Sequence, residues 1–450
     1  MSKRFECHAH THYSNIRLID AICRPKELIE TAYNLGYSGI AITDHEALCG
    51  HVDWLKAEKE LKEAEKIPKN FKCALGNEIY LVEDRETATQ YFHFILIAKN
   101  TEGHKALREL STIAWQSMSV KRGMERVPVT YAELKQVVLK YPGTLIATTA
   151  CLGGQMAKCT LSLIEQEKKK NNNDNIYNIK TEIKNFLDYC LDLFGEDFYI
   201  EIAPSLSEEQ IEYNERVIEI ADNLNIKIVL GCDAHYYTAA DREIHKAFLN
   251  SKEGEREVDD FYYYAHLMSN EEAYNNLKEY VTKEKFDEFC ANSIEIKDKI
   301  GEYNIFHKPI IPQVKVKDYP KNNFNIKEYP ILESLIDSDN IQERYWVNQC
   351  LEALEQKKLW NEEYLSRLQE EADILKTISD KLENCMFEYF NTFQHYIDLF
   401  WECGSIVGPG RGSSSCFLSN YLLGIVQLDA IKWKLPAFRF LNKERVELPD

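Results

Sequence analysis

The chain has 450 residues and a formal net charge of −19, because 73 Asp and Glu outnumber 54 Lys and Arg. This length leaves room for two or three domains with buried cores. A hydrophobic content of 44% excludes a chain that is disordered throughout. No run approaches ~20 apolar residues, so no membrane span is expected. The net acidity also argues against a protein that coats DNA by charge alone.

Helix and strand patterns alternate over the first 250 residues. A helix is expected from Pro25, with Gly36 directly after its end. Short apolar runs then predict strands at residues 39–43, 145–150, 198–202 and 226–230. Apolar strands separated by helices indicate βαβ units and a parallel sheet, which can close into a barrel.

The composition changes at two further places. Residues 168–175, KKKNNNDN, predict a solvated polar loop near 165–180. From about residue 283 to 403 long charged helices replace the strand patterns, and prolines between 309 and 330 indicate a linker. The 13 cysteines form no CxxC pair, which argues against a zinc ribbon or a disulfide framework and favours a reducing, cytoplasmic location.

Side chains that can bind metal stand at the ends of the predicted strands. His8 and His10 are separated by one residue, so both leave the same face of a strand. Asp233 and His235 have the same spacing and follow the 226–230 strand. Single candidates in or beside other strand-like runs are His45, Glu78, His93 and Cys151. Loops at the strand ends form the open face of a parallel barrel, so these side chains are expected to converge there.

Imidazole and carboxylate ligands together favour zinc, manganese or iron over magnesium. The candidates outnumber the ligands of one tetrahedral zinc ion, so a multinuclear cluster is expected, and clustered metals suit phosphodiester hydrolysis. Taken singly, each histidine is more readily explained as a packed or surface residue, and Cys151 as an apolar filler. The prediction therefore depends on their joint placement.

A glycine- and serine-rich segment, GPGRGSSS, covers residues 408–415 and runs directly into an apolar helix at 416–424. Glycines let backbone N–H groups approach an anion, and Arg411 supplies a planar set of donors for phosphate. A flexible linker is the alternative interpretation, but linkers rarely abut a core helix. We therefore expect this segment to bind phosphate.

These motifs resemble the N-terminal part of the α subunit of bacterial DNA polymerase III, a C-family polymerase. The segments 8–10, 42–45, 76–78, 150–153 and 233–235 resemble its polymerase and histidinol phosphatase (PHP) domain. Residues 407–413, 440–446 and Pro449-Asp450 resemble the start of its palm. The resemblance implies an α/β fold, with a distorted (β/α)7 TIM-like barrel over residues 1–280. A mainly helical α+β partial palm is expected over 281–450.

The resemblance also implies a site for up to three ions with nine ligands: His8, His10, Asp20, His45, Glu78, His93, Cys151, Asp233 and His235. Asp20 is predicted from the resemblance alone. Zinc, manganese or iron would occupy the site, and Asp233 and His235 would also act in catalysis. The family relationship further suggests 3′–5′ exonuclease activity, and contacts from Arg411, Gly412 and Ser413 to nucleotide phosphates.

In the family, two aspartates that hold catalytic magnesium follow the residues matched by Pro449-Asp450, and this sequence stops before them. Polymerisation is therefore not expected from this chain alone, which would be a shortened polymerase or one half of a split one, as a phage could encode. Expected partners are a DNA primer–template, the remaining palm, thumb and fingers, and other replication proteins, in the cytoplasm of a bacterium or of a phage host. The alternatives are a phosphoesterase acting on small phosphomonoesters and a non-catalytic, metal-stabilised scaffold.

Overall fold

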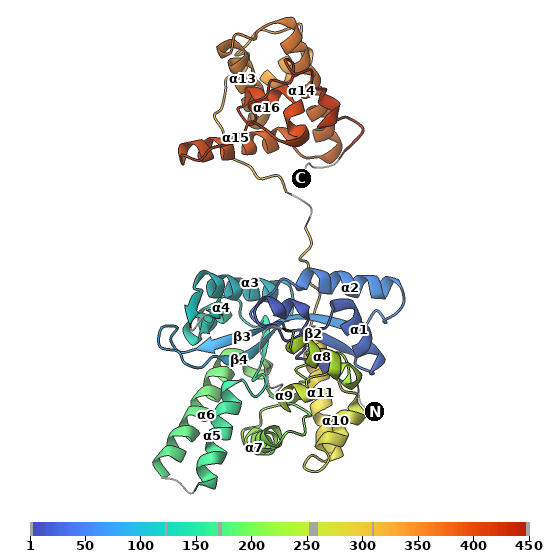
Figure 1. Ribbon diagram of the computed structural model, residues 1–450, viewed down its shortest axis with the longest axis vertical. Helices are drawn as coiled ribbons and strands as arrows, with labels where there is room; N and C mark the ends of the chain where they lie inside the picture. Colours follow the sequence, from blue (N-terminus) through green and yellow to red (C-terminus); the bar gives the residue numbers. More distant parts are fainter. Residues whose placement is uncertain (1–2, 122–123, 170–172, 252–259, 308–309, 447–450) are drawn as a thin grey trace. The chain divides into compact units, whose positions relative to one another are not determined.

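The computed structural model describes residues 3–446 except 122–123, 170–172, 252–259 and 308–309, so Pro449-Asp450 lies outside the described residues. The chain divides into two compact units, Met1–Ile305 and Phe306–Asp450 (Figure 1). A domain boundary at 280/281 would precede helix α11 (Lys283–Lys299). That helix packs against strands of the first unit, where the Phe5 N–H donates to Ser293 Oγ at 3.0 Å.

A seven-stranded path forms the centre of the first unit, in the order β1-β2-β3-β4-β8-β9-β10. Its strands are β1 (Phe5–Glu6), β2 (Gly39–Ile42), β3 (Lys72–Val82), β4 (Phe92–Ala98), β8 (Leu145–Thr148), β9 (Phe198–Ile202) and β10 (Ile228–Leu230). Short β7 (Val129–Thr130) pairs with β3. A parallel bridge between Ala9 and Ala234 joins the two ends of the path. The predicted seven-stranded, barrel-like α/β fold is confirmed.

Strand β4 differs from the expected parallel arrangement, because it runs antiparallel to both β3 and β8. The connection from β3 to β4 covers only residues 83–91, whereas a parallel crossover needs a dozen or more residues. The reversal brings the start of β4 to the edge where the other strands end. His93 therefore lies at that edge although it stands near the beginning of its strand.

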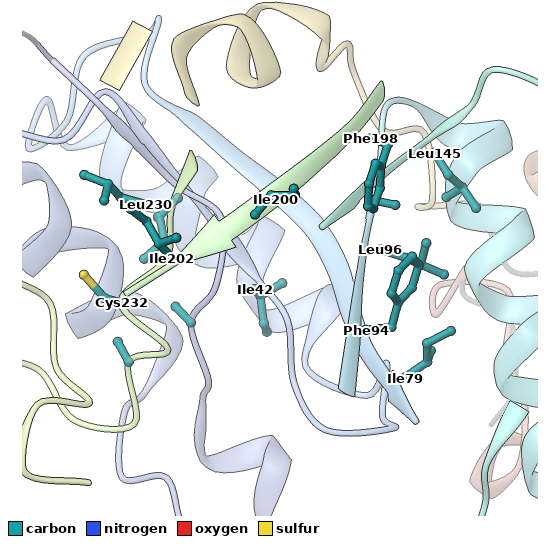
Figure 2. Packing of buried hydrophobic residues seen from close by; sticks show 14 of the residues in the cluster. Ile42, Ile79, Phe94, Leu96, Leu145, Phe198, Ile200, Ile202, Leu230 and Cys232 are labelled. Carbon is teal, nitrogen blue, oxygen red and sulfur yellow. The ribbon is translucent and has the colours of Figure 1, made fainter. Parts of the chain in front are cut away.

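The strands bury both of their faces. In β9, Phe198, Ile200 and Ile202 belong to the large core beneath the helices (Figure 2). Tyr199 belongs to the small core inside the barrel, so Glu201 is also expected inside from the alternation of the strand. The surrounding helices are α1 (Pro25–Asn34), α2 (His51–Glu63), α3 (Thr101–Gln116), α4 (Tyr131–Lys140), α5 (Gln155–Lys168), α6 (Asn173–Phe194), α7 (Glu208–Leu224), α8 (Arg242–Leu249), α9 (Asp260–Tyr263) and α10 (Asn270–Leu277).

The polar segment near 165–180 is largely helical rather than a loop. Helix α5 continues to Lys168 and α6 begins at Asn173, while residues 170–172 are not described. Ile176, Ile179 and Ile183 of α6 pack against the core at helical spacing. The apolar residues at helical spacing therefore explain why α6 is helical although its first residues are polar. A separate ladder of β5 (Ser119–Lys121) and β6 (Met124–Arg126) follows α3.

The second unit is mainly helical, as predicted, and its described residues contain no strand. Its helices are α12 (Pro330–Ile336), α13 (Ile341–Gln356), α14 (Glu362–Leu382), α15 (Met386–Glu402) and α16 (Leu418–Leu422). Trp346, Leu368 and Phe387 are completely buried in its core. Across the described parts of both units, no helix is long and apolar enough to cross a membrane.

Candidate metal centre

The predicted metal-binding side chains converge at one end of the barrel. Three groups have ligand atoms within 4.8 Å of one another: His8, His10, Glu78 and Asp233; His10, His45 and His235; and Glu78, His93 and Cys151. The H-x-H and D-x-H pairs enter from β1 and β10, which are joined there by the Ala9–Ala234 bridge. All of these residues are buried except His93, which is partly exposed.

Glu78 and His10 each belong to two of the three groups. Glu78 Oε2 lies 3.1 Å from Nε2 of both His8 and His10. Asp233 Oδ1 lies 3.1 Å from Nε2 of His8 and 3.0 Å from Nε2 of His10. One ion could not use all these atoms, so the geometry is that of adjoining sites with shared ligands.

Asp20 joins this cluster from a loop rather than a strand. Its Oδ2 lies 3.0 Å from His45 Nε2 and 3.7 Å from His235 Nε2. Asn15 Oδ1 accepts the Asp20 N–H at 3.0 Å, and His245 Nε2 donates to the Asp20 carbonyl. No strand pattern marks this residue, so only the family resemblance could identify it.

Opposite charges control ionisation within the cluster. Burial opposes the charged form of Asp20, but His45 and His235 outweigh it and hold the pKa of this carboxyl below its usual value. His8 and His45 show the reverse balance: burial disfavours their protonation, yet neighbouring carboxylates raise the pKa of both. Without metal, protonated imidazoles would therefore balance the buried carboxylates.

Each central imidazole has a partner at its second nitrogen. The Nδ1 atom of His10 lies 3.1 Å from Ser14 Oγ, that of His45 lies 3.2 Å from the Tyr80 hydroxyl, and that of His235 lies 2.8 Å from the Asp233 carbonyl. His8 Nδ1 instead lies 2.6 Å from the carboxylate of Glu201. The sequence prediction missed Ser14, Tyr80 and Glu201. Glu201 had one visible signal: it is a charged residue within the apolar run FYIEI.

Asp44 organises the loop that follows His10. Its carboxylate accepts the Thr11 N–H at 2.6 Å, the Thr11 hydroxyl at 2.8 Å and the Ser14 hydroxyl at 2.8 Å. Since Asp44 precedes His45 in sequence, this network fixes the first and second strand ends relative to each other. The sequence prediction missed its role.

The residues present fit a group of divalent metal ions. Asp20 Oδ1 is buried without a hydrogen-bond donor, which is costly for a carboxylate. The Nε2 atoms of His8 and His10 approach to 3.1 Å, although at most one of them can donate to the other. Imidazole, carboxylate and thiol groups are the ligands of borderline metals such as zinc.

An open cavity of about 900 Å³ lies against the edge of the cluster, where His93 and Cys151 contribute to its lining. Lys158 of α5 is the basic side chain in this lining, and Glu165, Glu208, Glu209 and Glu212 make much of the remaining wall acidic. The cavity reaches the cluster at the edge where His93 is partly exposed.

The predicted phosphate-binding segment lies in the second unit. Arg411 is exposed and precedes the 3-10 turn Gly412–Cys416, which contains Ser413. Gly410 and Gly412 have φ values of 128° and 68°, which favour glycine. Buried Glu371 holds the following helix by accepting the N–H groups of Leu418 and Ser419 at 2.6 and 2.8 Å.

Comparison with known proteins agrees with both halves of this description. A PHP domain model matches residues 6–205, and a model described as the bacterial DNA polymerase III alpha NTPase domain matches residues 332–450. A probable DNA polymerase YorL from Bacillus subtilis strain 168 is 37% identical over 99% of this chain. The DNA polymerase III subunit alpha of Aquifex aeolicus is 30% identical over 100%. The chain thus combines a PHP domain with a DNA polymerase III alpha NTPase domain, and relatives named as DNA polymerases match it over its whole length.

The predicted family and the presence of a PHP domain are thus confirmed. A DNA-directed DNA polymerase of Bacillus phage SPbeta also matches, at 37% identity over 99% of the chain. The chain spans only 36% of the length of each of these three relatives. The metal-dependent nature of PHP domains agrees with the buried His, Asp and Glu groups found here.

Proposed function

We propose that this DNA polymerase III α homologue hydrolyses DNA 3′ ends at its PHP domain, as a metal-dependent 3′–5′ exonuclease. The observation that supports this is the convergence of buried imidazole, carboxylate and thiol groups beside an open cavity. We further propose that the chain forms part of a replicative polymerase.

The nine predicted ligands would hold up to three ions, with zinc preferred and manganese or iron as alternatives. Bound ions would supply the Lewis acidity that phosphate-ester hydrolysis requires. Asp233 would orient the imidazoles of His8 and His10, both of which its Oδ1 approaches closely. Asp233 and His235 would also carry the catalytic role implied by the family.

Residues of the cavity would bind and orient the DNA end. Lys158 is placed to contact a phosphate, because it is the basic group of the lining beside His93 and Cys151. The acidic wall would repel a long polyanion, so only a short frayed 3′ end is expected to enter. Burial of the central groups would limit access of bulk water to the rest of the cluster.

A 3′-labelled primer provides the test. Chelated protein should become active when Zn²⁺ or Mn²⁺ is added, and His8→Ala and Asp233→Ala should lose at least ~100-fold of this activity. His395→Ala, an exposed residue of α15, is the matched control and should retain it. Digestion that is independent of metal, or equal in all variants, would contradict the proposal.

The acidic cavity wall also supports a second candidate, a phosphoesterase acting on small phosphomonoesters. Turnover of such esters without digestion of primers would favour it. A metal-stabilised scaffold would instead show a metal-dependent melting temperature with neither activity.

In the second unit, Arg411, Gly412 and Ser413 would contact nucleotide phosphates. The partners would be a DNA primer–template, a polypeptide equivalent to the remaining palm, thumb and fingers, and other replication proteins. The location would be the cytoplasm of a bacterium or of a phage-infected host. Filter binding of labelled primer–template to wild type and Arg411→Ala would test the phosphate contact.

A further inference from the structure

Glu201 is a buried charge that neither sequence motif nor proposed ligand set explains. It is only 2% exposed, and it lies on β9, which contributes none of the nine predicted ligands. Its Oε1 lies 2.6 Å from Nδ1 of His8. A buried carboxylate is expensive unless it has partners, so its environment should reveal its role.

The surroundings hold this carboxylate in one position. Thr148 Oγ1 donates to Oε2, the Glu201 N–H donates to Thr149 Oγ1 at 2.9 Å, and the Tyr213 hydroxyl donates to the Glu201 carbonyl at 3.2 Å. Gly231 leaves space for the carboxylate, since a Cβ at this position would lie 2.1 Å from Oε1. Both oxygens and the backbone of Glu201 are therefore fixed.

The opposite side of the His8 ring faces the cluster. Nε2 lies 3.1 Å from Glu78 Oε2 and 3.1 Å from Asp233 Oδ1. An imidazole that holds a metal ion at Nε2 is neutral and carries its one N–H at Nδ1, where the Glu201 carboxylate would accept it. The lone pair of Nε2 then points toward the shared ligand groups, and the carboxylate makes that nitrogen a stronger donor to a cation.

We propose that Glu201 is a positioning residue that orients His8 and strengthens it as a metal ligand. The inference rests on the proposed metal site and extends it to β9. The partners of Nδ1 in His10 and His235 are a hydroxyl and a carbonyl group, while His45 Nδ1 lies 3.2 Å from the Tyr80 hydroxyl and 3.3 Å from Oε2 of Glu78, itself a predicted ligand. Glu201 thus gives His8 a carboxylate partner from outside the predicted ligand set. In the described part of the chain, the other three rings have carboxylate neighbours only among the predicted ligands.

Metal affinity tests the proposal without reference to catalysis. Zn²⁺ affinity is measured by competition with a chromophoric chelator, and Co²⁺ coordination by its visible absorption spectrum. Glu201→Ala should weaken binding at the position that uses His8 by about 10–100-fold and change the Co²⁺ spectrum. Glu201→Gln should lose less, because its amide oxygen still accepts from Nδ1 while the charge is gone. Gly231→Ala should also weaken binding, because it crowds the carboxylate.

Glu6→Gln is the matched control. Glu6 is completely buried, and its Oε1 accepts the backbone N–H groups of His8 at 3.1 Å and of Cys232 at 2.9 Å. The Glu6→Gln substitution therefore removes a buried carboxylate, as Glu201→Gln does, but one that touches no imidazole. We expect this variant to keep the wild-type metal affinity and spectrum, even if its melting temperature falls.

The outcomes separate the two proposals. If wild type binds neither metal, the metal site and the role of Glu201 both fail. If wild type binds metal but Glu201→Gln and Gly231→Ala match it in affinity and spectrum, the metal site stands and the positioning role is refuted. Should Glu201→Ala not fold, these two milder variants still decide the question.

Discussion

His51 should make the first unit sensitive to acid. Its Nε2 donates to the Gly76 carbonyl at 2.9 Å, and His104 Nε2 lies 3.2 Å from its Nδ1. Burial, reinforced by His104, lowers the His51 pKa from 6.5 to about 3. The unfolded chain takes up a proton near pH 6.5 while folded His51 stays neutral, so stability is lost as pH falls below 6.5.

The size of this effect follows from the interval between pH 6.5 and the working pH. At pH 5 the unfolded state gains about 2 kcal/mol from protonating His51, because each pH unit is worth about 1.4 kcal/mol. His51→Gln removes this term and keeps a donor for Gly76. The loosened region would be β3, the strand that carries Glu78.

Urea unfolding at pH 7.5 and 5, with a chelator present, measures the difference. Tryptophan fluorescence is suitable because Trp54 is buried on the same helix as His51. Wild type should lose about 2 kcal/mol more than His51→Gln between the two pH values. His395→Gln, exposed in the second unit, should behave as wild type. An equal loss in wild type and His51→Gln would refute the reasoning.

Three other predictions concern the two candidate sites. Zinc at 100 times its dissociation constant should stabilise the first unit by about 2.7 kcal/mol and leave the stability of the second unit unchanged, as measured by calorimetry. Equal stabilisation of both units would argue against a site in the barrel. Zinc binding should release protons and weaken as pH falls, because carboxylates raise the pKa of His8 and His45. Calorimetry in buffers of different ionisation enthalpy would detect the released protons. A binding enthalpy that does not depend on the buffer would contradict this prediction. Glu371→Ala should lower the free energy of unfolding by about 3 kcal/mol and expose residues 412–423 to proteases, because two buried N–H groups lose their acceptor. The control is Glu370→Ala, a substitution at the exposed neighbouring residue. Equal proteolysis of the two variants would disprove the prediction.

Local sequence patterns could predict much of the barrel and its ligand pairs. A spacing of two residues on a strand fixes the face of both side chains, so His8 with His10 and Asp233 with His235 were recognisable before any tertiary arrangement was known. The apolar runs at β2, β8, β9 and β10 were equally clear, because strands buried on both faces read as continuous hydrophobic sequence.

Features that depend on distant contacts could not be found in this way. The reversal of β4 follows from a short connection whose meaning appears only once β3 and β4 pair. Asp20 lies in a loop and reaches the cluster because Asn15 and His245 hold its backbone. Glu201 acts through His8, 193 residues away. No local periodicity records such partnerships, although a lone charge in an apolar strand signals that one exists.

The electrostatics of the cluster explain how it can stay folded while it remains suited to cations. Burial disfavours the charged carboxyls, yet histidines hold the pKa values of Glu78 and Asp233 below their usual ranges, so these groups remain anionic. Burial lowers the pKa of His8 and His45, but the neighbouring carboxylates raise it by more. Without metal, protons on these imidazoles therefore supply the positive charge that metal ions would supply. A metal ion would displace those protons without requiring new buried charge to be created. The fixed carboxylate of Glu201 stays at Nδ1 of His8 throughout this exchange, and it stabilises the ring both when Nε2 carries a proton and when it faces a metal ion.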